Sequence, residues 1–203
     1  MADTNKVKFG LKNVHYALAT ETTTGTLTFS TVVAIPGAVN LTLDAAGAEA
    51  ANFYADDIIY YVSPARNNGY TGTLEIAKIP DAFRTDILGD ITDAKGMLLE
   101  NAEATSKQFA LLFEFNGDKE TTRHIMYNCT AARPSVGSAT IEDSATPQTE
   151  TLNLTAIPMK YTYTTGTAST DYFIVKAKAD KTAASTAFNA WFTTVQTPNI
   201  TGA

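Results

Sequence analysis

Three side chains in this sequence are soft metal ligands: His15, His124 and Cys129. A structural zinc ion needs about four such ligands in a tetrahedron. On a regular strand, His124 and Cys129 are an odd number of residues apart, so their side chains point to opposite faces and cannot share a metal ion. We therefore interpret Cys129 as a small buried apolar residue and His124 as an exposed or interfacial strand residue.

Acidic and nucleophilic residues also lack a catalytic spacing. Asp56 and Asp57 are adjacent, and neighbours on a strand face opposite ways, so they do not form the facing carboxylates of a glycosidase. We interpret them as the solvated start of a strand. Ser63 and Ser135 lack the glycine-flanked turn of a nucleophile elbow. Nothing in these residues supports an enzyme, and no cofactor or metal is expected.

The elements that carry these residues are mainly strands. Thr alternates with apolar residues in short runs along the chain, and this period of two is typical of strands with one buried face. Asn116-Gly117-Asp118 separates two long runs and predicts a hairpin. The predicted strands are 14–18, 27–33, 39–43, 56–62, 70–77, 97–99, 109–115, 121–131, 152–157 and 172–177.

Two helices are predicted beside the strands. Pro80-Asp81 begins the first, and Gly89 is placed to end it. Asp180 or Thr182 is the expected cap of a second helix near the C-terminus, which ends before Pro198. Each helix has one apolar stripe, formed by Phe83, Ile87 and Leu88 in the first and by Phe188, Trp191, Phe192 and Val195 in the second.

Two segments lack a clear period. The Ala-rich segment 45–55 is compatible with a short helix or with a projecting loop. Residues 134–148 combine Gly, Pro, Ser and two acids and are predicted to form a mobile loop. No linker or long repeat divides the chain, so residues 1–203 are predicted to form a single domain.

Composition limits the function. The chain has 203 residues, 44% hydrophobic and 18% charged, with a net charge of −6. Tight binding to nucleic acid needs clustered Lys and Arg, whereas a surface past which DNA slides should be neutral or acidic. One cysteine excludes an internal disulfide, and neither a signal peptide nor an apolar run long enough to span a bilayer is present. Synthesis and folding in a cytoplasm are therefore expected.

Eight runs carry a family resemblance: 9–17, 36–41, 52–56, 68–75, 79–84, 109–119, 123–131 and 147–152. In these runs the chain resembles the major tail (tail tube) proteins of long-tailed, non-contractile bacteriophages of Gram-positive hosts. The resemblance covers roughly residues 5 to 160 in order and fades towards the C-terminus. Its motifs belong to the scaffold rather than to a site.

The resemblance implies an all-β fold, a β-sandwich or half-barrel of two antiparallel sheets with a flanking helix. Six copies would form a ring, and stacked rings would form the tail tube of a virion made in the host bacterial cytoplasm. Inner strands would join into one barrel around a lumen, which removes exposed sheet edges. DNA would pass through without specific binding. The implied partners are further copies and the tape measure, tail terminator and distal tail proteins, without a membrane.

Candidate residues for these roles follow from the alternation and the loops. Asp44, Asp57 and Glu114 are candidates for the lumen lining, where acids would repel phosphate. The loops 44–55 and 134–148 are candidates for contacts between subunits or rings, although 44–55 is equally compatible with a plain connection. Trp191 either packs on its own sheet or reaches a neighbouring subunit. The subunit-contact candidates are Glu49, Asn52, Glu142, Asp143 and Trp191.

One alternative of another class stays open at this point. A carbohydrate-binding or adhesin-like β-sandwich would also be an all-β surface protein. It would require a shallow aromatic groove, and the nine tyrosines do not obviously converge on one in the sequence.

Overall fold

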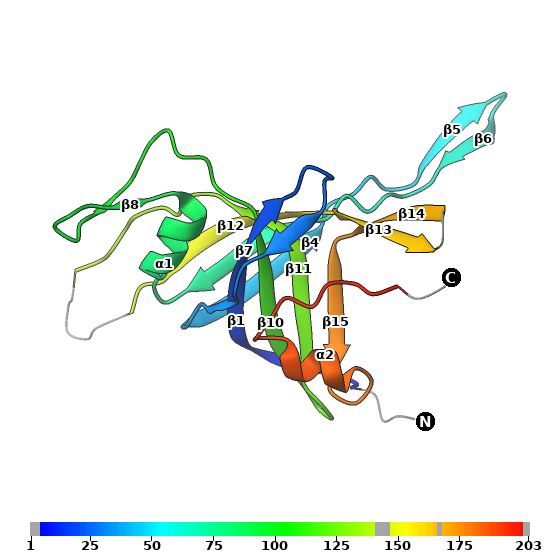
Figure 1. Cartoon of the computed structure of the whole chain (residues 1–203). Helices are drawn as coiled ribbons and strands as arrows, with labels where there is room; N and C mark the ends of the chain where they lie inside the picture. The colour runs from blue at the N-terminus through cyan, green and yellow to red at the C-terminus, as the bar shows by residue number, and fades with distance from the viewer. Residues whose placement is uncertain (1–4, 141–146, 166–167, 201–203) are drawn as a thin grey trace.

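The computed structural model describes residues 5–140, 147–165 and 168–200, and antiparallel strands make up most of it (Figure 1). The large sheet has nine strands in the order β2-β1-β10-β11-β12-β7-β4, with β3 beside β1 and β15 beside β11. The all-β fold class is confirmed. The strands of this sheet are β1 (Lys8–Glu21), β2 (Leu27–Phe29), β3 (Val33–Ala34), β4 (Ala38–Ala45), β7 (Tyr70–Ile76), β10 (Phe109–Gly117), β11 (Thr122–Ala131), β12 (Glu150–Ile157) and β15 (Lys176–Asp180).

The large sheet divides at β11. Residues 122–126 of β11 pair with β15, whereas residues 128–131 pair with β12. Between these halves β11 carries one extra residue, because Met126 lies opposite Leu111 and Cys129 lies opposite Phe109. Beyond the division, β12, β7 and β4 continue the sheet, and β4 packs near β1. The strands therefore curl around a shared interior, as a half-barrel does.

The first hydrophobic core fills this interior. Alternate strand residues point into it, which explains the period of two in the sequence. A helical segment closes one end: α1 (Asp81–Phe83) continues into the π-helical η1 (Arg84–Leu88). The buried ring of Phe83 packs edge-on against Tyr16 and Phe109. Gly89 ends the segment at φ 79°, a left-handed conformation that favours glycine, so the predicted first helix is confirmed.

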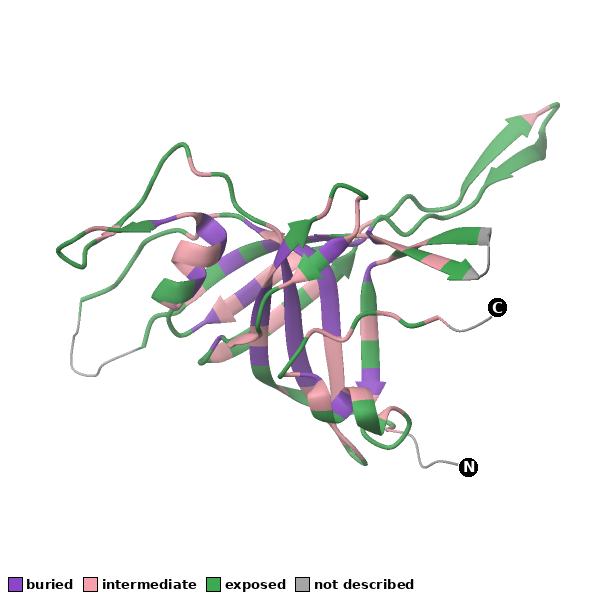
Figure 2. Ribbon diagram, viewed as in Figure 1, coloured by how far each residue is buried: buried purple, intermediate pink, exposed green. Residues whose placement is uncertain are grey.

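A second core lies on the opposite face of β1, β10 and β11. The helix α2 (Ser185–Ala190) covers this face, and Phe188 and Trp191 are buried there with Leu112 and Tyr127. Figure 2 shows that β10 and β11 carry much of the buried surface. The C-terminal helix predicted from the sequence is present, but it is only six residues long and neither predicted residue caps it.

The two predicted caps have other partners. The α2 segment begins after Ala184, which makes no capping bond through its side chain. The Asp180 carboxylate accepts a hydrogen bond from the Thr122 hydroxyl, and the Thr182 hydroxyl donates to Glu120. These bonds attach the loop before α2 to the start of β11, so the prediction of a cap at either position is wrong.

Three two-stranded hairpins leave the main sheet. They are β5 (Ala51–Ala55) with β6 (Ile58–Ser63), β8 (Ile91–Thr92) with β9 (Leu98–Leu99), and β13 (Met159–Thr165) with β14 (Ala168–Ile174). The segment 45–55 projects, as one of its two predicted conformations required, but its second half is a strand rather than a loop. The strand predicted at 172–177 is two strands that break at Val175, and β13 was not predicted.

The remaining predictions concern the loop 134–148 and membrane-spanning segments. Residues 134–140 and 147–148 have no regular secondary structure, and the rest of that loop lies outside the described residues. Within the described ranges, no helix is long and apolar enough to cross a membrane.

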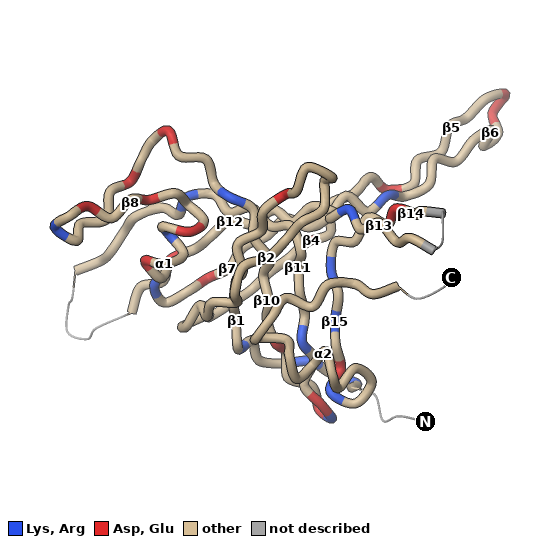
Figure 3. Tube along the Cα trace, viewed as in Figure 1, with Lys and Arg blue, Asp and Glu red and all other residues tan. Residues whose placement is uncertain are grey.

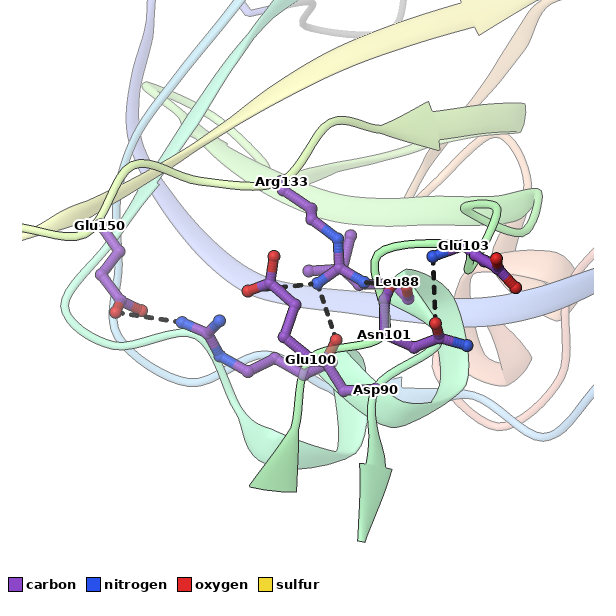
Figure 4. Close-up of polar contacts among 8 residues, drawn as sticks. Leu88, Asp90, Glu100, Asn101, Glu103, Arg133 and Glu150 are labelled. Atoms are coloured by element: carbon purple, nitrogen blue, oxygen red, sulfur yellow. Dashed lines mark hydrogen bonds and ion pairs between the residues drawn. The ribbon is translucent and has the colours of Figure 1, made fainter. Parts of the chain in front are cut away.

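A cluster of ion pairs ties the helical segment to the ends of two strands (Figure 4). The Arg133 guanidinium lies 2.7 Å from the buried carboxylate of Asp90 and donates to the Leu88 carbonyl. The guanidinium of Arg84 lies 3.2 Å from the Glu150 carboxylate. These charges are compensated within the chain, so the cluster positions the helical end of the half-barrel rather than forming a reactive site.

Candidate functional site

The outward face of β4, β7 and β12 is a regular array of polar side chains, which we call the threonine face. Leu41, Leu74 and Leu152 point into the core, so their neighbours along each strand point outward. Strand pairing places the outward residues in three cross-strand rows. These rows are Asn40, Glu75 and Thr151; Thr42, Thr73 and Asn153; and Asp44, Thr71 and Thr155.

The threonine face carries negative charge only. Its ionisable residues are Asp44 and Glu75, and β4, β7 and β12 contain no Lys or Arg. The Glu75 carboxylate accepts a hydrogen bond of 2.6 Å from the Thr149 hydroxyl, whereas Asp44 is exposed. The threonine face has hydroxyls, amides and two carboxylates but no cation. Because counterion release requires cations that neutralise phosphates, this face would not hold a DNA backbone.

The threonine face ends at an open sheet edge. β4 is eight residues long and pairs with β7 along one side; on its other side no strand pairs with it among the described residues. β15 likewise pairs on one side only, with β11, in the described part of the chain. Unpaired edges of this kind are templates for another chain. In the described part of the chain, β4 and β15 are therefore among the sheet edges to which another chain could add.

The hairpin of β5 and β6 projects away from the body (Figure 1). Residues 58–62 of β6 are all apolar or aromatic, so both faces of this strand are apolar. Neither core includes a residue of this hairpin. A two-stranded hairpin alone is marginally stable in water, and large exposed apolar patches mark interaction surfaces. Its exposed large side chains are Phe53, Tyr54, Ile58, Ile59, Tyr60, Tyr61 and Val62, each at least half exposed, with Tyr60 at 72%.

Two candidate lining acids do not lie on the threonine face. Glu114 is 3% exposed; its carboxylate lies 2.8 Å from Nε of Arg123 and 3.3 Å from Nζ of Lys12. A buried, compensated carboxylate cannot repel a passing phosphate, so we drop Glu114 from the lining. Asp57 lies at the tip of the β5–β6 hairpin, where the two-residue turn Asp56-Asp57 has positive φ angles of 51° and 61°. These acids form a turn, not the predicted start of a strand.

Trp191 lies in the second core of its own chain. Its side chain is 2% exposed, and its indole N–H donates to the His124 carbonyl at 3.2 Å. Of the two alternatives for Trp191, the structure therefore shows packing on the parent sheet, which leaves too little surface for a contact with another subunit.

The other contact candidates divide into two groups. Glu49 is exposed on the segment that leads into the β5–β6 hairpin, and Asn52 is exposed within β5 itself. Glu142 and Asp143 lie outside the described residues. The apolar residues of β6 were not singled out from the sequence, although the run Ile58-Ile59-Tyr60-Tyr61-Val62 was visible as a strand with no polar face.

The bulge in β11 corrects the argument about His124 and Cys129. Because one extra residue follows Met126, Cys129 returns to the same face as Met126 and packs in the first core. The ring of His124 also lies on this face, stacked 5.3 Å from the Phe113 ring. The described residues contain no group of three or more side chains that could hold a metal ion.

Acid should destabilise the fold through His124. Burial is the main cause that lowers the pKa of His124 to about 4, and the neighbouring Lys176, Lys178 and Lys8 add to it. Between pH 6.5 and 4, His124 is therefore protonated in the unfolded state but neutral in the folded state. Stability is therefore lost as the pH falls through this window. We expect a loss of about 1–2 kcal/mol from this group, since partial contact with water reduces the full effect.

Urea unfolding of the monomer at pH 7 and pH 4.5 measures the effect, with His124→Gln as the variant that cannot titrate. His124→Gln should lose less stability than the native chain over the same interval. Equal losses in the two proteins would show that His124 does not contribute.

The arrangement described so far defines a class: a structural subunit with an uncharged-to-acidic sheet face, open sheet edges and an exposed apolar hairpin. A family model described as phage tail tube protein matches residues 2–202. The chain belongs to this family, as its resemblance to the major tail proteins of Gram-positive phages implied. No curated protein matches the chain. Membership makes it a structural component of the phage tail, and thus of the virion.

Proposed function

We propose that six copies of this chain, each acting as one domain, close into a ring and that the rings stack into the tail tube through which DNA leaves the virion. The observation that carries this proposal is the threonine face beside the open edge of β4. Joining of edge strands from copy to copy would extend the face into a continuous barrel. The lining would then be hydroxyls, amides and the carboxylates of Asp44 and Glu75.

The exposed hairpin provides the second part of the proposal. Its large apolar side chains are at least half exposed and belong to neither core of the described residues. Assembly is the step that would bury them, at roughly 1.5–3 kcal/mol for each large side chain fully buried. Glu49, just before the hairpin, and Asn52, within β5, stay candidates for contacts between subunits or rings. Tape measure, terminator and distal tail proteins are the proposed partners at the lumen and the tube ends, and synthesis takes place in the host cytoplasm.

Electron microscopy of the purified protein tests the assembly directly. Rings or tubes of uniform diameter are the expected result. A chain that stays monomeric at high concentration and low temperature, and that does not enter tails when supplied to phage lacking their own subunit, would reject the proposal.

Lysines on the threonine face should slow DNA release. The variant Thr42→Lys with Asp44→Lys adds cations to two rows of the face, and cations hold phosphate through counterion release. Tubes should still assemble, and ejection should slow by about ten-fold at low salt and recover as salt screens the charges. Release of DNA from purified virions, followed by a fluorescent dye, measures this.

The matched control carries the same substitutions away from the face. Glu103 and Thr105 are exposed beside η1, so Glu103→Lys with Thr105→Lys changes the net charge equally. Ejection should keep its native rate in this control. Native ejection rates in both variants would place the lumen on another surface.

A further inference from the structure

A hollow on the inner side of the sheet has the chemistry to receive an acidic, apolar segment. We call it the lysine hollow. It has a volume of about 190 Å³ and is lined by Leu41, Leu43, Tyr70 and Phe115, with Lys8 and Lys176 among its walls. Leu41, Leu43, Tyr70 and Phe115 are half-buried, whereas Phe113 and Met126, which also line the hollow, are buried. The half-buried residues stay open because the curl of β12, β7 and β4 does not cover this part of β10 and β11. A second recess with Lys6 and Lys178 adjoins it and shares Lys8 and Phe115.

The cations of the lysine hollow lack acidic partners. Nζ of Lys8 lies 5.4 Å from the centre of the Phe115 ring, and Nζ of Lys176 lies 4.6 Å from that of Tyr70. Neither ammonium group forms an ion pair with a described residue, whereas Lys178 pairs with Asp180 at 3.3 Å. Burial is the main cause of the lowered pKa of the adjacent His124, and Lys176, Lys178 and Lys8 lower it further. A cationic surface would hold DNA, so in a working tube the hollow should be covered.

The β5–β6 hairpin carries the complementary chemistry. Its tip holds Asp56 and Asp57, exposed and without a cationic partner among the described residues, and Tyr54 and Ile58 flank them with exposed apolar surface. Figure 3 shows acidic positions at the far end of this hairpin, away from the body. The tip of a chain therefore does not reach the hollow of the same chain. The tip offers two carboxylates between apolar side chains, and the lysine hollow offers two ammonium groups beside apolar side chains. The two surfaces are therefore complementary in both charge and polarity.

We propose that the acidic tip of the β5–β6 hairpin from one copy seats in the lysine hollow of another copy. The contact is heterologous, because each copy supplies one tip and one hollow, and heterologous contacts propagate into rings or open tubes. It rests on the proposed function, since it names the surface that receives the hairpin in the assembled tube. It also explains why an acidic chain keeps unpaired lysines beside its inner sheet.

Charge reversal tests this contact. Lys8→Glu with Lys176→Glu should raise the critical concentration for tube formation by about ten-fold or more, because like charges then meet. Adding Asp56→Lys and Asp57→Lys to the same chain restores opposite charges and should recover most of the loss. Lys95→Glu with Lys107→Glu is the matched control, exposed near the far end of the half-barrel, and should polymerise as the native chain does.

A cross-link gives a second measurement that does not depend on energies. The variant Asp57→Cys with Lys176→Cys should form a ladder of dimers and larger oligomers on a non-reducing gel after oxidation of tubes. Glu103→Cys with Lys176→Cys should give no ladder. The natural Cys129 does not interfere, because it is 1% exposed and burial raises the pKa of its thiol to about 12.

The outcomes separate the two proposals. Tubes from the native chain, together with no effect of charge reversal and no ladder, would overturn the seating of the tip and leave the tube function intact. Failure of the native chain to form tubes, by itself or in phage, would instead reject the tube function on which the seating rests.

Discussion

Deletion of residues 48–66 abolishes polymerisation and leaves a folded monomer: this is the expected result for the variant that lacks the β5–β6 hairpin. Backbone bonds link Asn68 N–H to the Ala46 carbonyl and Ala46 N–H to the Gly69 carbonyl. The deletion therefore leaves Gly47 and Asn67 as a two-residue loop between paired strands, and Gly-Asn suits the tight turn of such a hairpin. Light scattering and electron microscopy measure polymerisation.

The fold should tolerate this deletion because the hairpin contributes no residue to either core. We expect the melting temperature to stay within a few degrees of the native monomer. A milder variant, Tyr60→Ser with Phe53→Ser, keeps the hairpin and removes two of its exposed rings, so it should weaken assembly without ending it. Tubes of native diameter from the deleted chain would show that the hairpin is no assembly element.

Local signals predicted the parts of the fold that neighbouring residues decide. Pro80-Asp81 and Gly89 delimit the first helical segment because they act on the backbone around them. The alternation along β4 likewise predicted that Asp44 points to the sheet face opposite that of Leu41 and Leu43. Asp44 accordingly lies on the threonine face. Asp56-Asp57 also carried a local signal, since Asp tolerates the left-handed conformation of a tight hairpin turn.

Other features depend on contacts between distant segments. Alternation alone puts Glu114 on the face opposite Phe113 and Phe115, but whether that face meets water depends on α2, about seventy residues later in the chain. The bulge after Met126 has no Gly or Pro to mark it, so the common face of His124 and Cys129 was not predictable. How copies of the chain pair with one another depends on contacts between chains, so a local sequence pattern predicts it even less.

Loss of the Arg123 guanidinium should cost the fold about 3–5 kcal/mol, because it leaves the buried carboxylate of Glu114 with only the half-exposed Lys12 as a cationic partner. The guanidinium also lies 3.9 Å from the centre of the Phe188 ring and 4.6 Å from that of Phe192, and it donates to the Phe188 carbonyl. Arg123→Ala therefore removes both the counter-ion and the anchor of α2. Chemical unfolding of the monomer measures the loss.

Two further variants separate the charge from the packing. Lys12→Ala removes the half-exposed partner of the same carboxylate and should cost less than about 1 kcal/mol, since exposed ion pairs contribute little. Arg123→Met with Glu114→Leu removes both buried charges and keeps apolar volume, so it should recover most of the stability that Arg123→Ala loses. If the free energy of unfolding of Arg123→Ala is within about 0.5 kcal/mol of that of the native chain, Glu114 is not held by this ion pair. The reason for excluding Glu114 from the lumen lining would then no longer hold.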